Sequence, residues 1–216
     1  MATLPELPAN YGAAMLLIDE AHALDPRTAE ARVGAEGERV PYELHYARKM
    51  TRWLAVRSPG ASPVLQLACR AQHFRRWEIP RSSYPMTRAG YLTWRAKLKA
   101  QAAAQVAELL SASSGDGGGG GGGAISPADV DRVAALIRKE NLGSDGEAQA
   151  LEDVACLVFL DDQFDGFESK PELDEDKVVG ILRKTWAKMS AEGRALALQM
   201  DLSERAKALI GKALEG

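Results

Sequence analysis

The chain has few of the residues on which several common kinds of site depend. Only two cysteines and three histidines occur among 216 residues, fewer sulfur and nitrogen ligands than a structural zinc site readily needs. Cys69 and Cys156 each stand inside an apolar segment, which predicts buried, reduced thiols. The longest apolar run, residues 154–160, is far shorter than the roughly 18 residues of a membrane span. The N-terminus lacks the features of a signal or transit peptide, so we expect a cytoplasmic protein without a membrane segment.

Alternating patterns typical of strands are also missing, whereas helical spacing of apolar residues continues through almost the whole sequence. Serine, threonine and proline at helix starts divide this pattern into separate helices. The prediction is an all-α fold in which residues 1–216 form a single compact multi-helix domain. The expected helices cover residues 11–23, 42–56, 64–77, 87–111, 127–140, 146–167, 174–189, 191–200 and 204–214.

Seven consecutive glycines, residues 117–123, interrupt the helical pattern. Such a tract has no side chains to bury, so residues 115–124 are predicted to be a disordered, flexible insertion within the domain. A phosphate-binding glycine loop would follow a strand and end in Gly-Lys-Ser/Thr. Neither feature is present, which argues against that function for the tract.

Charge is distributed unevenly along the chain, although the formal net charge is only −3. Residues 48–99 contain twelve Lys or Arg and one acid, Glu78, whereas residues 140–176 contain thirteen Asp or Glu and one base, Lys170. The densest basic segment, residues 72–99, also holds five of the thirteen aromatic residues. Guanidinium groups bind oxyanions in a fork and stack on flat rings, so this segment predicts a site for a planar or phosphorylated anion.

The residues expected to bind such an anion lie in and before a proline-containing loop, residues 77–88. Two prolines restrict the loop backbone, which reduces the entropy lost on binding. The alternative is that these arginines neutralise the acidic helices of the same domain. The predicted substrate-binding residues are Arg75, Arg76, Trp77, Arg81, Tyr84 and Arg88.

Acidic residues and one histidine form a second set of candidates. Glu43 shares a helical face with apolar residues, so its carboxylate must find a partner. Glu152 and Asp153 precede an apolar helical segment, and His73 follows one. We predict that His73, Glu152 and Asp153 are catalytic and that Glu43, His73 and Asp153 bind a divalent metal. The alternative is that Glu152 and Asp153 favour the helix N-terminus and pair with arginines, with His73 a hydrogen-bonded interior residue.

Four motifs carry a resemblance to known families: ELHYARKMTRWL, LACRAQHFRRWEIPRSSYPMTRAGYLTWR, LEDVACLVFL and LRKTWAKMS. They resemble an uncharacterised domain-of-unknown-function family of bacterial, fungal and algal proteins that is often labelled glutamyl-tRNA synthetase. The resemblance implies a single helical domain and no established activity. Members often have His-Ala where this chain has residues 99–102, Lys-Ala-Gln-Ala. The metal-ligand set also resembles that of HD-type helical phosphohydrolases, although His73 is followed here by Phe74 and Glu43 stands in place of a histidine.

The synthetase label can be compared with the residues themselves. Lys188, Met189 and Ser190 resemble the start of a class I synthetase KMSKS loop, but Ala191 follows and no HIGH-like motif is present. The missing strands also leave no nucleotide-binding sheet. We therefore expect no synthetase activity, and Ser190 is expected to cap the next helix.

Two functions remain open from the sequence. The first is an anion-binding helical protein, a metal-assisted phosphohydrolase or related enzyme that acts on a phosphorylated small molecule or nucleotide. The alternative is a non-catalytic module that binds RNA or protein through a basic aromatic surface. An enzyme requires the basic residues to converge with His73 in a pocket, whereas an RNA-binding module requires them to spread over an exposed face.

Overall fold

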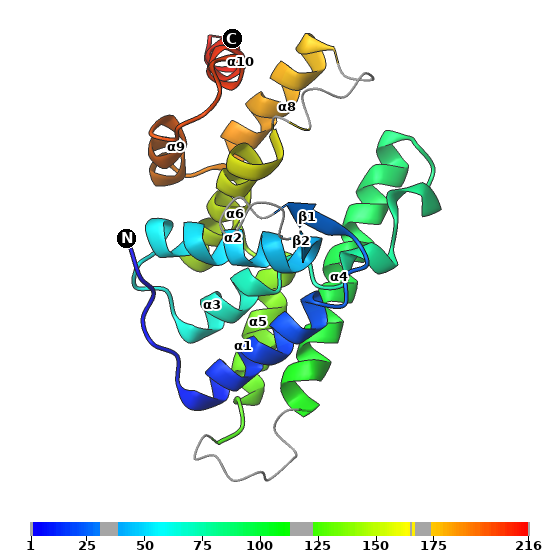
Figure 1. Ribbon diagram of the computed structural model, residues 1–216, viewed down its shortest axis with the longest axis vertical. Helices are drawn as coiled ribbons and strands as arrows, with labels where there is room; N and C mark the ends of the chain where they lie inside the picture. The colour runs from blue at the N-terminus through cyan, green and yellow to red at the C-terminus, as the bar shows by residue number, and fades with distance from the viewer. Residues whose placement is uncertain (1, 31–38, 113–122, 165, 167–173, 216) are drawn as a thin grey trace.

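The computed structural model describes residues 2–30, 39–112, 123–164, 166 and 174–215. This part of the chain is mainly α-helical (Figure 1), which confirms the predicted fold class. The helices are α1 (Ala9–His22), α2 (Tyr42–Arg57), α3 (Pro63–Arg70), α4 (Arg88–Ala112), α5 (Pro127–Arg138), α6 (Gly146–Val158), α8 (Glu175–Lys188), α9 (Ala191–Leu198) and α10 (Glu204–Leu214). Two short 3-10 helices, η1 (Arg76–Glu78) and η2 (Arg81–Ser83), precede α4, and a π-helix, η3 (Phe159–Gln163), follows α6.

Side-chain caps explain where most helices begin. A serine or aspartate side chain accepts a backbone N–H of the first turn, which satisfies a donor that the helix itself cannot pair. At α4 the Thr87 hydroxyl accepts the N–H of Gly90 at 3.1 Å. The other caps are Ser62, Ser126, Asp145, Asp174, Ser190 and Ser203.

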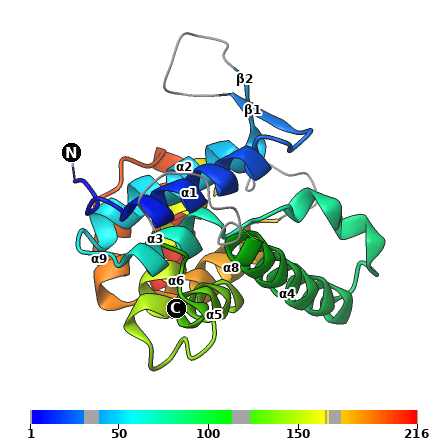
Figure 2. The same cartoon turned by 90° about the horizontal axis from the view of Figure 1, so that it is seen from below.

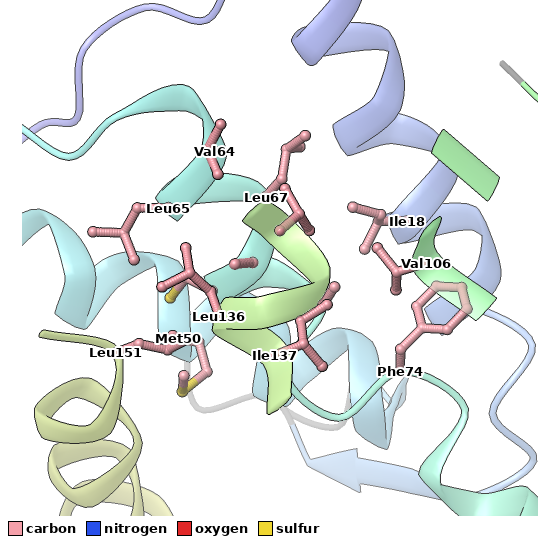
Figure 3. Packing of buried hydrophobic residues seen from close by; sticks show 14 of the residues in the cluster. Ile18, Met50, Val64, Leu65, Leu67, Phe74, Val106, Leu136, Ile137 and Leu151 are labelled. Atoms are coloured by element: carbon pink, nitrogen blue, oxygen red, sulfur yellow. The ribbon is translucent and has the colours of Figure 1, made fainter. Parts of the chain in front are cut away.

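Two clusters of buried apolar residues form the interior. The larger joins α1 to α6 and is shown in Figure 3; its members include Ile18, Met50, Leu65, Leu67, Phe74, Val106, Leu136, Ile137 and Leu151. The smaller joins the end of α6 and η3 to α8, α9 and α10, and includes Leu157, Phe164, Leu182 and Leu209. Trp53 of α2 packs against both clusters. Helix α6 contributes to both interiors, so it connects the N-terminal helices to the C-terminal ones.

Two local features differ from the prediction. Residues 28–30 and 39–41 form an antiparallel pair, β1 (Thr28–Glu30) and β2 (Arg39–Pro41), in which Ala29 pairs with Val40. These strands lie at the edge of the molecule beyond α1 and α2 (Figure 2) and are too short for an alternating pattern to reveal. The helix expected over residues 64–77 ends at Arg70. Turns follow, and Arg75 adopts a left-handed backbone conformation with φ of 48°, which an α-helix cannot contain.

The predicted linker and the predicted absence of a membrane segment are the two remaining expectations about the fold. The linker expected over residues 115–124 falls largely on residues 113–122, which lie outside the described part of the chain. Among the described residues, no helix is both long enough and apolar enough to cross a membrane.

Candidate functional site

A pocket of about 830 Å³ lies where the turns after α3 meet α2, α4, the residue after α5, α6, η3 and α8. Its volume is within the range usual for small-molecule sites, about 300–1,000 Å³. The lining combines aromatic, apolar and charged side chains: Tyr46, Gln72, His73, Phe74, Arg76, Tyr91, Arg95, Leu98, Lys99, Ala102, Lys139, Glu152, Ala155, Cys156, Phe159, Gln163, Ile181, Lys184, Thr185, Ala187 and Lys188.

The lining is strongly positive. One carboxylate, Glu152, faces six cationic side chains: Arg76, Arg95, Lys99, Lys139, Lys184 and Lys188. Four helical segments contribute these cations, since α4 supplies two, α8 supplies two, and η1 and the end of α5 supply one each. The positive charge is therefore assembled by the fold and does not belong to one segment of sequence.

Glu152 is already paired within the protein. Its Oε2 accepts a hydrogen bond from Lys139 Nζ, and its Oε1 lies 3.7 Å from Lys188 Nζ. Burial alone would raise the pKa of Glu152, but Lys139 and Lys188 outweigh burial, so its pKa lies below the usual value. Glu152 is thus a carboxylate at neutral pH and is shared between two of the six cations.

Four of the six cations have no carboxylate partner in the described part of the chain. Within the described part of the chain, no carboxylate lies within ion-pairing distance of Arg76, Arg95, Lys99 or Lys184. Burial lowers the pKa of Lys99, and the neighbouring Lys139 and Arg95 lower it further. Burial and Arg95 likewise lower the pKa of Arg76. Cations that repel one another in a partly desolvated pocket leave a favourable place for an anion.

Arg76 and His73 form a specific pair at one side of the pocket. The Arg76 guanidinium lies 4.9 Å from the centre of the Trp94 ring, and its Nη1 lies 2.9 Å from His73 Nε2. Because arginine can only donate, Nε2 of His73 accepts, and the neutral imidazole carries its proton on Nδ1. Burial, followed by the charges of Arg76 and Arg95, holds the pKa of His73 well below its usual value. His73 also stacks on Tyr46, with ring centres 3.9 Å apart.

Lys139 reaches the pocket from a strained backbone. It is the residue after α5 and has φ of 59° and ψ of 45°, the left-handed conformation that usually takes glycine at a helix end. A side chain at this position costs stability relative to glycine. The side chain present is a cation that faces the pocket and pairs with Glu152. Strain of this kind is typical of functional sites.

The π-helix η3 forms another part of the wall. Phe159 and Gln163 of this segment line the pocket, and Gln163 Nε2 donates to the Tyr42 hydroxyl at 3.0 Å. Asp161 and Asp162 of the same turn bind α2 instead: Asp161 accepts from Lys49 Nζ at 2.8 Å, and Asp162 Oδ1 lies 2.8 Å from His45 Nε2. The wider π turn therefore directs its acids to α2 and its aromatic and amide side chains to the pocket, and such turns recur at functional sites.

Only one of the six predicted substrate-binding residues, Arg76, lines the pocket. Arg81 donates to the backbone carbonyls of Tyr84 and Pro85 at 3.0 and 2.8 Å, so it fixes its own loop. Arg75 lies 3.7 Å from Glu78, and Arg88 is exposed at the start of α4. The remaining two predicted residues, Trp77 and Tyr84, are half-buried outside the lining.

Asp153, the neighbour of Glu152, lies in a different environment. It is fully buried and accepts hydrogen bonds from Arg57 Nε at 2.8 Å, from the Ser190 N–H at 2.8 Å and from the Ser190 hydroxyl at 2.6 Å. Gln149 Nε2 also donates to it at 3.0 Å. Gly193 packs so closely that an added Cβ would lie 2.6 Å from Asp153 Cγ. We call Arg57, Gln149, Asp153 and Ser190 the Asp153 junction; it joins α2 and α6 to the start of α9.

Glu43 lies outside both the pocket and the Asp153 junction. It is fully buried; Arg27 donates to its Oε1 at 3.1 Å, and its Oε2 lies 3.6 Å from His22 Nδ1. Burial raises the pKa of Glu43, and His22 and Arg27 offset this only in part.

The predicted metal ligands are therefore not assembled. Glu43 contacts His22 and Arg27. His73 contacts Arg76, and Asp153 is held by the other residues of the junction. Among the residues that the structure describes, no group of three or more His, Cys, Asp or Glu side chains is placed to hold a metal ion. Of the predicted catalytic residues, His73 and Glu152 both line the pocket, whereas Asp153 does not.

Sequence reasoning missed most of the pocket's cations. Arg95 and Lys99 belong to the basic segment, residues 72–99, but its composition does not show which face of α4 they occupy. Lys139 lies beside Glu140, so the local sequence there shows mixed charge. Lys184 and Lys188 belong to residues 177–191, a stretch without acids that lies far along the chain from the basic segment.

Comparison with known proteins adds a family but no activity. No curated protein and no solved structure matches the chain. One family model matches residues 12–210, which include every helix that contributes to the pocket. The chain thus belongs to the family described as Domain of unknown function (DUF4202).

Proposed function

We propose that the protein binds a small phosphorylated molecule or nucleotide in the pocket between α4, α6 and α8. The observation that carries the proposal is the excess of cations there: six line the pocket, and its one carboxylate is already shared by Lys139 and Lys188. Buried or half-buried cations without a counter-ion are costly. A polyanionic ligand would remove that cost and add charge-assisted hydrogen bonds.

The shape of the site supports a small ligand over RNA. The unpaired cations converge on a concavity of about 830 Å³ from several helices, whereas an RNA-binding surface would present arginines and aromatic rings across an exposed face. Arg81 of the proline-containing loop is bound by the loop's own carbonyls. The aromatic lining, Tyr46, Phe74, Tyr91 and Phe159, offers contact for an organic part of the ligand.

The proposal is limited to binding and does not include metal-assisted hydrolysis or an HD-like mechanism. Such chemistry would need ligands for a metal, and Glu43, His73 and Asp153 have separate partners. His73 is also a poor free base in this arrangement, because Arg76 occupies its Nε2 lone pair.

Calorimetric titration of the whole protein with inorganic pyrophosphate and with ATP tests the proposal. We expect binding that weakens as salt is added, since screening reduces the attraction between charges. Arg95→Met should weaken the affinity by roughly 10- to 100-fold, the usual effect of a lost charge-assisted hydrogen bond. Arg88→Met is the matched control, because it removes the same charge from an exposed position outside the pocket. Absence of binding, or equal losses in the two variants, would contradict the proposal.

A further inference from the structure

Lys99 differs chemically from the other nucleophilic groups of the pocket. It lines the cavity from α4, is half-buried, and has no carboxylate within ion-pairing distance in the described part of the chain. Lys139 and Lys188 are paired with Glu152, and Lys184 is exposed. Burial raises the pKa of the Cys156 thiol to about 12, which keeps it protonated at neutral pH.

We propose that Lys99 is a carbonyl-reactive amine that forms an imine with the aldehyde or ketone group of a phosphorylated ligand held in the pocket. This inference rests on the proposed function, because the other cations must first hold the phosphate. A lysine becomes nucleophilic when it is desolvated or placed next to other cations, and Lys99 meets both conditions. The ligand class thereby narrows to phosphorylated carbonyl compounds.

The step balances without a further reactant. The neutral amine of Lys99 attacks the carbonyl carbon, a C–N bond forms, and the amine proton passes to the carbonyl oxygen to give a carbinolamine. Loss of water then produces the imine, and water reverses the reaction. Cationic neighbours favour the neutral amine over the ammonium ion. The charged groups that act on Lys99 come from several elements and are Lys139, Arg95, Glu152 and Lys188. Arg76 and Lys184 line the same pocket.

The electrostatic effect on Lys99 has a definite sign. Burial, then Lys139, then Arg95 lower its pKa, and Glu152 opposes them only partly. The reactive neutral fraction of Lys99 should therefore appear at lower pH than that of an exposed lysine. Lys97 provides the comparison, since it lies two residues away on the same helix and is exposed.

The experiment uses pyridoxal 5′-phosphate, a phosphorylated aldehyde, together with cyanoborohydride, which reduces an imine to a stable secondary amine. Peptide mapping by mass spectrometry then measures labelling of each lysine. At neutral pH we expect Lys99 to be labelled more than about tenfold faster than Lys97, because binding holds the aldehyde beside the amine. The labelling rate of Lys99 should also reach its plateau at a lower pH than is usual for a lysine amine.

Two variants and one competitor complete the design. Lys99→Arg retains the positive charge but has no amine that can form an imine, so the fast labelling should disappear; Lys97→Arg should leave it unchanged. Inorganic pyrophosphate should protect Lys99. If pyrophosphate binds but Lys99 reacts no faster than Lys97, the imine inference is wrong and the proposed function stands. If Lys99 reacts selectively but pyrophosphate neither binds nor protects, the anion-binding function fails and the inference that depends on it falls too.

Discussion

The pocket and the Asp153 junction both gather charged side chains around α6, but they differ in what satisfies those charges. At the junction, Asp153 accepts four hydrogen bonds, and its cation Arg57 also lies 2.6 Å from Glu192. In the pocket, six cations meet one carboxylate. Asp153 and Glu152 are adjacent in the sequence, but the charges around Asp153 are paired, whereas the cations around Glu152 outnumber the carboxylates.

The difference distinguishes charge that serves the fold from charge that is available to a ligand. A buried carboxylate with a complete set of donors is stable in place and has little capacity for further binding. Cations without counter-ions are disfavoured until an anion arrives. The number of charged residues in a segment is therefore less informative than the number that remain unpaired.

The largest expected effect concerns the junction. Asp153→Asn should lower the free energy of unfolding by roughly 3–5 kcal/mol, because it leaves Arg57 without its buried partner. Glu152→Gln should cost much less stability and should strengthen pyrophosphate binding, because it frees Lys139 and Lys188 for the ligand. Urea denaturation and calorimetry measure the two effects. A similar loss of stability in both variants would remove the distinction between the sites.

A pair of arginines sharpens the comparison. Arg76→Met should reduce pyrophosphate affinity by about 1.5–3 kcal/mol, the usual value for a hydrogen bond to a charged group, with little change in unfolding free energy. Arg57→Met should show the reverse, because Asp153 would then be buried without its cation. Binding isotherms and denaturation curves of the two proteins give this test. If Arg76→Met unfolds as readily as Arg57→Met, Arg76 has a structural role.

The pH dependence of stability reports on His73. Its folded pKa lies well below the unfolded value of 6.5, so below pH 6.5 the unfolded chain binds a proton that the folded protein does not. Its contribution to stability is therefore complete above about pH 6.5 and is lost as the pH falls. Between about pH 7.5 and pH 5.5 the loss should be at most about 1.4 kcal/mol, the limit set by protonation of the unfolded histidine.

His73→Gln provides the reference for this measurement, since every other titrating group remains. The wild-type protein should lose more stability than the variant over that interval, by up to about 1.4 kcal/mol. Equal losses in the two proteins would show that His73 is protonated in the folded state, and the Arg76 hydrogen bond would then be incorrect. Denaturant midpoints at the two pH values provide the data.

The smallest expected effect concerns the backbone of Lys139. Lys139→Gly and Lys139→Ala both remove the cation, but only glycine relieves the left-handed conformation. The glycine variant should be more stable than the alanine variant by about 1 kcal/mol, the lower end of the cost of a left-handed backbone for a residue with a Cβ, and both should bind pyrophosphate more weakly than wild type. Unchanged affinity in both variants would place Lys139 outside the binding site.

Much of the fold could be predicted because its signals are local. Ser126 followed by Pro127, or Ser190 before Ala191, satisfies the first backbone donors of a helix wherever the rest of the chain lies. The helix ends after residue 70 and at Lys139 were less predictable. In both regions a non-glycine residue, Arg75 or Lys139, takes a left-handed conformation, which the residue type does not reveal.

The candidate site was predicted only in part, and for a related reason. His73, Arg76 and Glu152 were identified from the sequence and line the pocket, but Arg81 occupies the carbonyls of its own loop and Asp153 occupies the junction. The contacts of Arg81 and of Asp153 both depend on which groups lie nearby in the folded protein. Residue type and spacing state what a side chain can bind, not what it has already bound.

The sequence by itself determined the helical class, most helix starts and an excess of cations between residues 48 and 99, because propensity, capping and composition act over a few residues. Only the tertiary structure decided which of those cations remain unpaired. It brought Lys139 from α5 and Lys184 and Lys188 from α8 to face Arg95 and Lys99. Electrostatic energy depends on distance and burial, which are properties of the packed helices and not of their order along the chain.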